Sequence, residues 1–137
     1  MIYISVIIDA SLLVSYYNNR DENHEKALKI MPEILNESFG KVFISDYVFD
    51  EVITVMLVRT KSHEKVKSIG SDLLNANMLY LKVNDRIFIE SWKYFLEKAP
   101  MSFTDFTILA MAKAYKIDYL ATFDKVLAKQ SGVKILP

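Results

Sequence analysis

The sequence predicts an α/β fold, in which a five-stranded parallel sheet lies between two layers of helices. Two observations favour this class: short apolar runs alternate with stretches of helical period, and the runs are continuously apolar. A sheet that helices cover on both faces buries both sides of its strands, which accounts for apolar runs without alternation. The predicted strands span residues 2–8, 41–45, 78–83, 118–122 and 133–136.

The predicted helices fill the intervals between these strands. The first, at residues 10–18, is short and ambiguous, and a further short helical stretch follows Asp124. The others have clearer helical periods, with apolar positions spaced for one face. They span residues 23–38, 46–60, 62–75, 84–98 and 103–115.

Two of these helices carry more specific expectations. Residues 46–60 are apolar nearly all round between Val48 and Val58, so we expect this helix to be buried on most sides. In residues 84–98, the spacing of the large side chains indicates one apolar face, made by Ile87, Phe88, Trp92 and Phe95.

Length and composition limit the possible classes of protein. The 137 residues are 52% hydrophobic with only 3 Gly and 3 Pro, which predicts one domain over residues 1–137 without long linkers. The absence of cysteine excludes disulfides and thiolate metal sites and suits a cytoplasmic protein. The net charge of zero does not indicate a strongly basic nucleic-acid-binding face. No run approaches the ~18 apolar residues of a membrane span.

Most acidic residues lie among polar neighbours and are predicted to face solvent, Asp21 and Glu97 among them. Four others lie in apolar surroundings: Asp9, Glu51, Asp105 and Asp124. Each has a purely structural interpretation. Asp9 and Asp124 suit helix N-caps, Asp105 completes an S-x-x-D capping box with Ser102, and Glu51 suits an ion pair.

The positions of the four acids also suggest a common site. Asp9, Glu51 and Asp124 all follow parallel strands, so they belong to one edge of the sheet, where ligands of such folds bind. Asp105 opens the helix before the fourth strand, and the acids would converge if the first and fourth strands are neighbours. Clustered carboxylates need a compensating cation, and oxygen ligands suit Mg²⁺ or Mn²⁺. This chemistry points to phosphodiester cleavage.

The order and spacing of these acidic residues and their neighbouring hydroxyl residues resemble the PIN domain family. The features that carry the resemblance are D-x-S at Asp9 and Ser11, Glu51 after the second strand, Asp105 at a helix start, and T-x-D at Thr122 and Asp124. The closing GVKILP is also similar to that family's last strand, and the resemblance covers the whole chain. It is greatest for the compact VapC-type toxins of toxin–antitoxin pairs.

The resemblance implies a metal-dependent endoribonuclease with a catalytic quartet of Asp9, Glu51, Asp105 and Asp124. Asp9, Asp105 and Asp124 would hold Mg²⁺ or Mn²⁺, and Glu51 would position or deprotonate the attacking water. Ser11 and Thr122 would organise the acidic loops. Asp50 competes with Glu51, because adjacent helical residues lie ~100° apart and cannot both face the site.

The resemblance also implies partners: an RNA substrate, a second copy in a homodimer, and a small antitoxin protein. The segment ITVMLV (residues 53–58) and the pair Tyr16–Tyr17 are candidates for protein contacts, although core packing explains each of these residues more simply. Basic residues that could line an RNA groove are Arg20, Arg59, Lys61, Lys113 and Lys125.

Three alternatives stay open. A related nuclease could process RNA without being a toxin. An aspartyl-phosphate enzyme is disfavoured, because Ser11 stands where a dehalogenase-like phosphatase needs a second Asp, and Asp9 lacks the acidic neighbour of a receiver domain. A non-catalytic binding module would use the acids only to cap helices, and metal ions would not stabilise it.

Overall fold

The computed structural model describes residues 3–137, and residue 2 of the first predicted strand lies outside this range. Five parallel strands form one sheet, as predicted, and their order is β3–β2–β1–β4–β5, which makes the first and fourth strands neighbours. The second strand has the predicted bounds, whereas the other four are shorter than their apolar runs at one or both ends. The strands are β1 (Ser5–Ile8), β2 (Lys41–Ser45), β3 (Leu79–Leu81), β4 (Tyr119–Ala121) and β5 (Lys134–Leu136).

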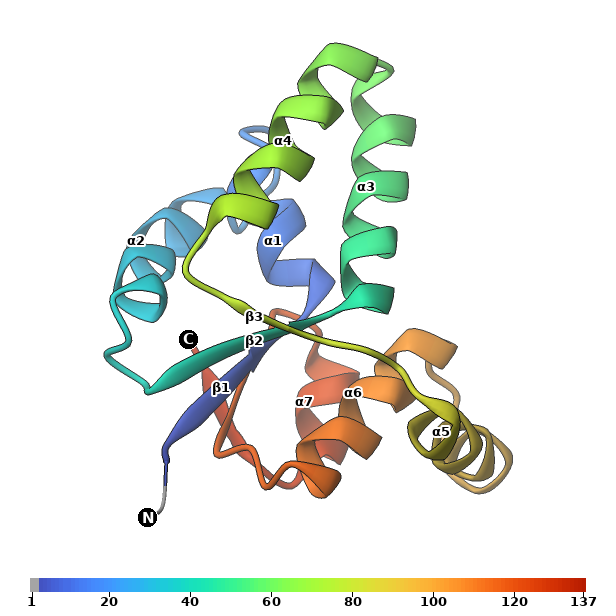
Figure 1. The fold of residues 1–137 in the computed structure, drawn as a ribbon. Coiled ribbons are helices and arrows are strands. Elements are labelled where there is room, and N and C mark those ends of the chain that lie inside the picture. Colours follow the sequence, from blue (N-terminus) through green and yellow to red (C-terminus); the bar gives the residue numbers. More distant parts are fainter. Residues whose placement is uncertain (1–2) are drawn as a thin grey trace.

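Helices cover both faces of the sheet, which confirms the predicted three-layer arrangement (Figure 1). One layer contains α1 (Ala10–Tyr17), α2 (His24–Leu35), α3 (Asp46–Thr60) and α4 (His63–Asn75). The other contains α5 (Asp85–Glu97), α6 (Phe103–Ala114) and α7 (Lys125–Ser131). None of the helices in residues 3–137 is long and apolar enough to cross a membrane.

Strand β1 lies at the centre of the sheet, between β2 and β4. Val6, Ile7 and Ile8 are wholly buried, because helices cover both faces and strands flank both edges. The register pairs Ile8 with Ala121, and the Asp9 N–H continues the ladder by donating to the Ala121 carbonyl at 2.9 Å. The apolar run therefore ends at the sheet edge with Asp9 held directly beside β4.

Helix α3 is less buried than the sequence predicts. Only the stripe of Val48, Val52 and Met56 is buried, whereas Leu57 and Val58 are 38% and 69% exposed. Figure 1 shows the reason, since α3 and α4 extend together away from the sheet, where fewer elements surround them. The expectation of burial on most sides was therefore wrong for the outer half of the helix.

Helix α5 presents an aromatic face that is only partly covered. Ile87 is buried against α6, but Phe88 and Trp92 remain about half exposed. Phe95 stacks on Trp92, with ring centroids 5.5 Å apart, and meets Phe106 of α6 edge-on at 5.8 Å. The predicted apolar face exists, but packing against one neighbouring helix leaves its rim in solvent.

Gly40 enters β2 with φ +86°, a backbone conformation that favours glycine. A Cβ there would lie 2.0 Å from the Ile4 carbonyl oxygen, whereas a Cβ at Gly132 (φ +70°) would meet nothing within 4 Å. We expect Gly132→Ala to lower the free energy of unfolding by about 1–2 kcal/mol, from the left-handed backbone alone. Gly40→Ala should cost about 3 kcal/mol or more, because the backbone must also shift.

Urea unfolding of the two variants checks this prediction, with Gly132→Ala as the matched control for the left-handed conformation. Equal losses of stability would show that the contact with Ile4 does not constrain the entry into β2.

Candidate active site

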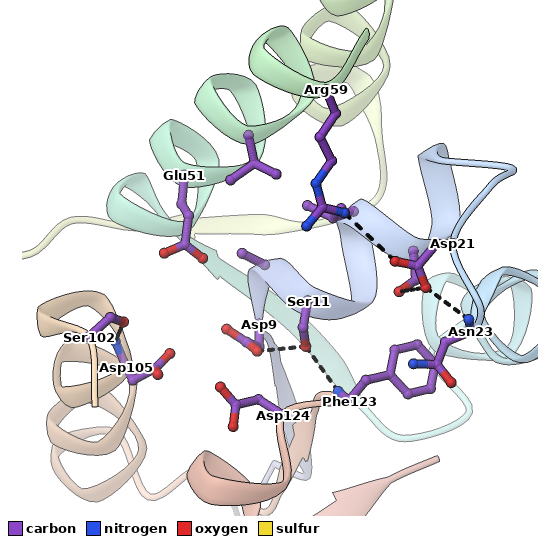
Figure 2. A pocket seen from close by; sticks show the side chains of 14 residues that line it. Asp9, Ser11, Asp21, Asn23, Glu51, Arg59, Ser102, Asp105, Phe123 and Asp124 are labelled. Atoms are coloured by element: carbon purple, nitrogen blue, oxygen red, sulfur yellow. Dashed lines mark hydrogen bonds and ion pairs between the residues drawn. The ribbon is translucent and has the colours of Figure 1, made fainter. Parts of the chain in front are cut away.

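The four predicted acids line one pocket at the carboxyl end of the sheet, with a volume of about 470 Å³ (Figure 2). The pocket lies where the winding of the sheet reverses, because the chain continues from β1 towards β2 and from β4 towards β5. Open α/β sheets bind their ligands at this point. Asp9 comes from the end of β1, Asp124 from the loop after β4, Glu51 from α3 and Asp105 from α6.

Asp9 is 2% exposed and occupies the N-cap position of α1, yet its side chain does not cap the helix. Its Oδ2 instead accepts hydrogen bonds from Thr122 Oγ1 at 2.7 Å and from Ser11 Oγ at 2.8 Å. Asp9 therefore stands at the N-cap position that the sequence suggests, but its carboxylate makes no capping hydrogen bond. The carboxylate points into the pocket, towards the space that the other acids share (Figure 2).

The two hydroxyl groups also join the start of α1 to the loop after β4. A hydroxyl has one proton to donate, and both Ser11 and Thr122 donate theirs to Asp9. As acceptors, Ser11 Oγ receives the Phe123 N–H and Thr122 Oγ1 receives the Asp124 N–H, both at 2.9 Å. The network thus ties Asp124 to the same frame as Asp9.

Helix capping positions two further acids and leaves carboxylate oxygens of each available to the pocket. Asp124 Oδ1 caps α7 by accepting from the N–H groups of Val126 and Leu127 at 2.9 and 3.0 Å. Ser102 Oγ caps α6 by accepting from the Asp105 N–H at 3.1 Å, as the S-x-x-D pattern predicts. The side chain of Asp105, only 8% exposed, extends towards the pocket (Figure 2).

The orientation of α3 separates Glu51 from its neighbour Asp50. Glu51 is half-buried and lines the pocket, whereas Asp50 is exposed and does not. Val55 and Arg59 also line the pocket, and they follow Glu51 at intervals of four residues. This i, i+4, i+8 stripe was readable in the sequence and would have placed Arg59 on the same helix face as Glu51, two turns further along.

Burial and mutual repulsion disfavour ionisation of these carboxylates. The pKa of Asp105 is raised to about 7, first by burial and then by the charges of Asp9, Asp124 and Glu51. Burial also raises the pKa of Glu51, with further contributions from Asp9 and Asp124. Burial raises the pKa of Asp9, against the lowering effect of its two hydroxyl donors. A positive charge inside the pocket would favour the ionised form of all three carboxylates and lower their pKa values.

Asp21 corrects an expectation from the sequence, which predicted a solvated side chain. Its side chain is only 18% exposed, lines the same pocket, and lies 3.8 Å from Arg59 Nη1. It also accepts from Ser15 Oγ at 2.9 Å and from the Asn23 N–H at 2.8 Å. Its polar neighbours in sequence gave no sign of this, because the loop between α1 and α2 folds back over α1.

The other basic residues that the sequence suggested for a groove are dispersed. Arg59 lines the acidic pocket, and Arg20 lines an adjoining cavity that also includes Arg59. Lys113 lines two other cavities, neither of which contains any of the four acids. Lys61 and Lys125 line neither the acidic pocket nor the adjoining cavity. Among residues 3–137, only Arg59 therefore brings a basic side chain to the acidic pocket itself.

The donors in the pocket fit a hydrated divalent ion better than a closed metal cage. No group of three or more His, Cys, Asp or Glu side chains within residues 3–137 is arranged to hold a metal ion directly. Mg²⁺ usually binds one or two carboxylates and keeps several waters in its coordination shell. Carboxylate oxygens around a cavity of this size suit that mode of binding.

Comparisons with known proteins give a matching family and several similar structures. Residues 6–133 match the PIN domain family. The structure is similar to the sarcin–ricin loop cleaving toxin VapC20 of Mycobacterium tuberculosis, with a TM-score of 0.83 and 19% identity, covering 96% of this chain and 99% of that one. It is also similar to VapBC from Salmonella typhimurium, in a DNA-bound crystal structure, with a TM-score of 0.67 and 16% identity, covering 96% of both chains.

A third similar structure is FitAcB of Neisseria gonorrhoeae, with a TM-score of 0.66 and 14% identity, covering 96% of both chains. At these identities the structural likeness establishes a shared fold. A sequence search of curated proteins finds no significant match.

The raised pKa of Asp105 predicts how stability depends on pH without divalent ions. Between the ordinary value of 3.8 and about 7, the folded state binds more protons than the unfolded state, so stability falls as pH rises through this window. Asp105→Asn removes this loss. We therefore expect the variant to melt at a higher temperature than the wild type above pH 7, with the difference shrinking towards pH 4.

Melting curves in EDTA from pH 4 to pH 8 test this expectation. Glu97→Gln, at the exposed end of α5, is the matched control for loss of one acid and should run parallel to the wild type. A parallel curve for Asp105→Asn as well would show that Asp105 is not under electrostatic stress.

Proposed function

The chain belongs to the PIN domain family, and from this premise and its acidic pocket we propose that it is a metal-dependent endoribonuclease. The observation that carries the proposal is the meeting of Asp9, Glu51, Asp105 and Asp124 in one pocket at the switch point of the sheet. These acids come from four separate elements, and helix capping alone does not account for three carboxylates with raised pKa values.

The residues divide into two roles in this proposal. Asp9, Asp105 and Asp124 would hold Mg²⁺ or Mn²⁺, directly or through water. Once bound, the ion would offset charge on the phosphate and ease deprotonation of a water molecule. Glu51 faces the other acids across the pocket, and its raised pKa suits a group that accepts a proton from the attacking water. Ser11 and Thr122 orient Asp9, and their hydrogen bonds favour its ionised form.

We further propose that the chain works as a single-domain cytoplasmic toxin of a type II toxin–antitoxin pair. Support comes from the fold, which it shares along nearly its whole length with VapC20 and with VapBC complexes. By analogy, a small antitoxin would block the pocket and a second copy would form a homodimer. A PIN-type RNA-processing nuclease outside any toxin pair is the nearest alternative, since it would use the same pocket.

Glu51→Gln should reduce RNA cleavage by roughly 10²–10⁴-fold, the usual contribution of general acid–base catalysis. Asp50→Asn is the matched control, because it removes one negative charge from the exposed side of the same turn and should cleave at the wild-type rate. Cleavage of a mixed tRNA, rRNA and mRNA pool with Mg²⁺ or Mn²⁺, followed by gel electrophoresis, measures both.

EDTA should abolish cleavage by the wild type, and added Mn²⁺ should restore it. Cleavage that persists in EDTA, or that Glu51→Gln leaves unchanged, would refute the proposed mechanism.

Metal binding should also appear as thermal stabilisation, independent of activity. An ion at about 100 times its Kd adds about 2.7 kcal/mol of stability when it binds only the folded state. We expect millimolar Mn²⁺ to raise the melting temperature of the wild type. Asp124→Asn should lose most of this shift, because Asn still caps α7 but lacks the charge.

Asp50→Asn should keep the full shift and serves as the control for lost negative charge. A wild-type melting temperature indifferent to Mn²⁺ would favour the non-catalytic binding module, in which the acids only organise the loops.

A further inference from the structure

A second cavity, of about 620 Å³, adjoins the acidic pocket and has the opposite charge. Its basic side chains are Arg20, Arg59 and Lys65, and the rest of its lining is amide and hydroxyl residues such as Asn19. Within the described part of the chain, no acidic residue lines it. We call this cavity the basic pocket.

Arg59 belongs to both cavities and forms their common wall. Its side chain remains 51% exposed, while its Nη1 lies 3.8 Å from Asp21 Oδ2. Asp21 is itself fixed by Ser15 and Asn23, so it orients the guanidinium from one side. A guanidinium has five N–H donors, and most of these stay available to a ligand.

Arg20 and Lys65 have no ion-pair partner among residues 3–137. The ion pairs in that range are Arg59–Asp21, Lys67–Glu64 and Lys93–Glu90. The surrounding turns are held by side-chain oxygens that accept from backbone N–H groups: Asn18 Oδ1 accepts from the Arg20 N–H at 3.1 Å, and Ser62 Oγ from the Lys65 N–H at 3.2 Å. Two unpaired cations thus share one concave site with Arg59.

Resting on the proposed ribonuclease activity, we propose that the basic pocket binds a backbone phosphate of the RNA strand that neighbours the scissile phosphate. The acidic pocket accepts a phosphate only together with a metal ion, whereas the basic pocket neutralises one directly. A ligand that satisfies both must carry phosphates at successive positions, as a single-stranded RNA does. Arg59 is then a positioning residue that sets the register of the strand over the carboxylates.

The test compares two double variants that lose the same charge. Arg20→Gln/Lys65→Gln removes both unpaired cations of the basic pocket, and Lys67→Gln/Lys93→Gln removes two exposed cations elsewhere. Fluorescence anisotropy with a labelled ten-nucleotide RNA measures binding in the Glu51→Gln background, where cleavage is slow. Melting curves establish that each variant is folded.

We expect the basic-pocket variant to bind roughly tenfold more weakly and the slope of its salt dependence to fall by about 0.7, since the pocket contacts one phosphate and each single-strand phosphate contact contributes about 0.7. The control should keep both the affinity and the slope. Equal weakening of the two variants, or no change in either, would overturn the proposal. Competition by poly-glutamate of equal charge as effective as RNA would also overturn it, in favour of an acidic protein partner.

A kinetic measurement separates this inference from the proposed function. With Glu51 restored, the basic-pocket variant should show a raised KM and an unchanged kcat on the ten-nucleotide RNA, but unaltered cleavage of a dinucleotide. Binding that changes as expected without any cleavage would refute the ribonuclease function and leave the phosphate site standing. Cleavage with an unchanged KM and salt slope would refute the phosphate site alone.

Discussion

The buried carboxylate of Asp9 is the constraint around which this end of the molecule is built. It sits at the end of the central strand with 2% exposure, where an uncompensated charge is very costly. Two hydroxyl donors that are far apart in the sequence stabilise it, Ser11 on α1 and Thr122 after β4. Because these hydroxyls in turn accept the N–H groups of Phe123 and Asp124, satisfying one charge also sets the path of a distant loop.

The structural and the chemical roles of these acids are not alternatives. Asp124 uses one oxygen to cap α7, and the cap that Ser102 provides leaves the side chain of Asp105 directed at the pocket. Capping fixes the backbone of each acid, so the carboxylates can be held close together despite their repulsion. The pKa of Asp105, raised to about 7, reflects the burial and the repulsion between carboxylates that remain. Such a raised pKa is typical of sites that bind a cation or move a proton.

The charges of the chain are segregated in space although they cancel in sum. Seventeen basic and seventeen acidic residues give a net charge of zero, yet one pocket gathers five carboxylates and the adjoining cavity gathers three cations. Arg59 stands at the boundary, held by Asp21. Net charge therefore says little about affinity for a polyanion, because a strand of RNA experiences the local field over a few ångströms rather than the sum.

The sequence by itself determined the elements and the candidate acids, because apolar period and capping patterns are local properties. The continuous run before Asp9, the S-x-x-D pattern at Ser102 and the strand–helix alternation were all sufficient for this purpose. Only the tertiary structure decided which strands are neighbours, that Glu51 rather than Asp50 faces the pocket, and that Asp21 is partly buried beside Arg59. It also decided that α3 and α5 keep apolar surface in solvent. These outcomes depend on contacts between residues far apart in the chain, about which a local pattern carries no information.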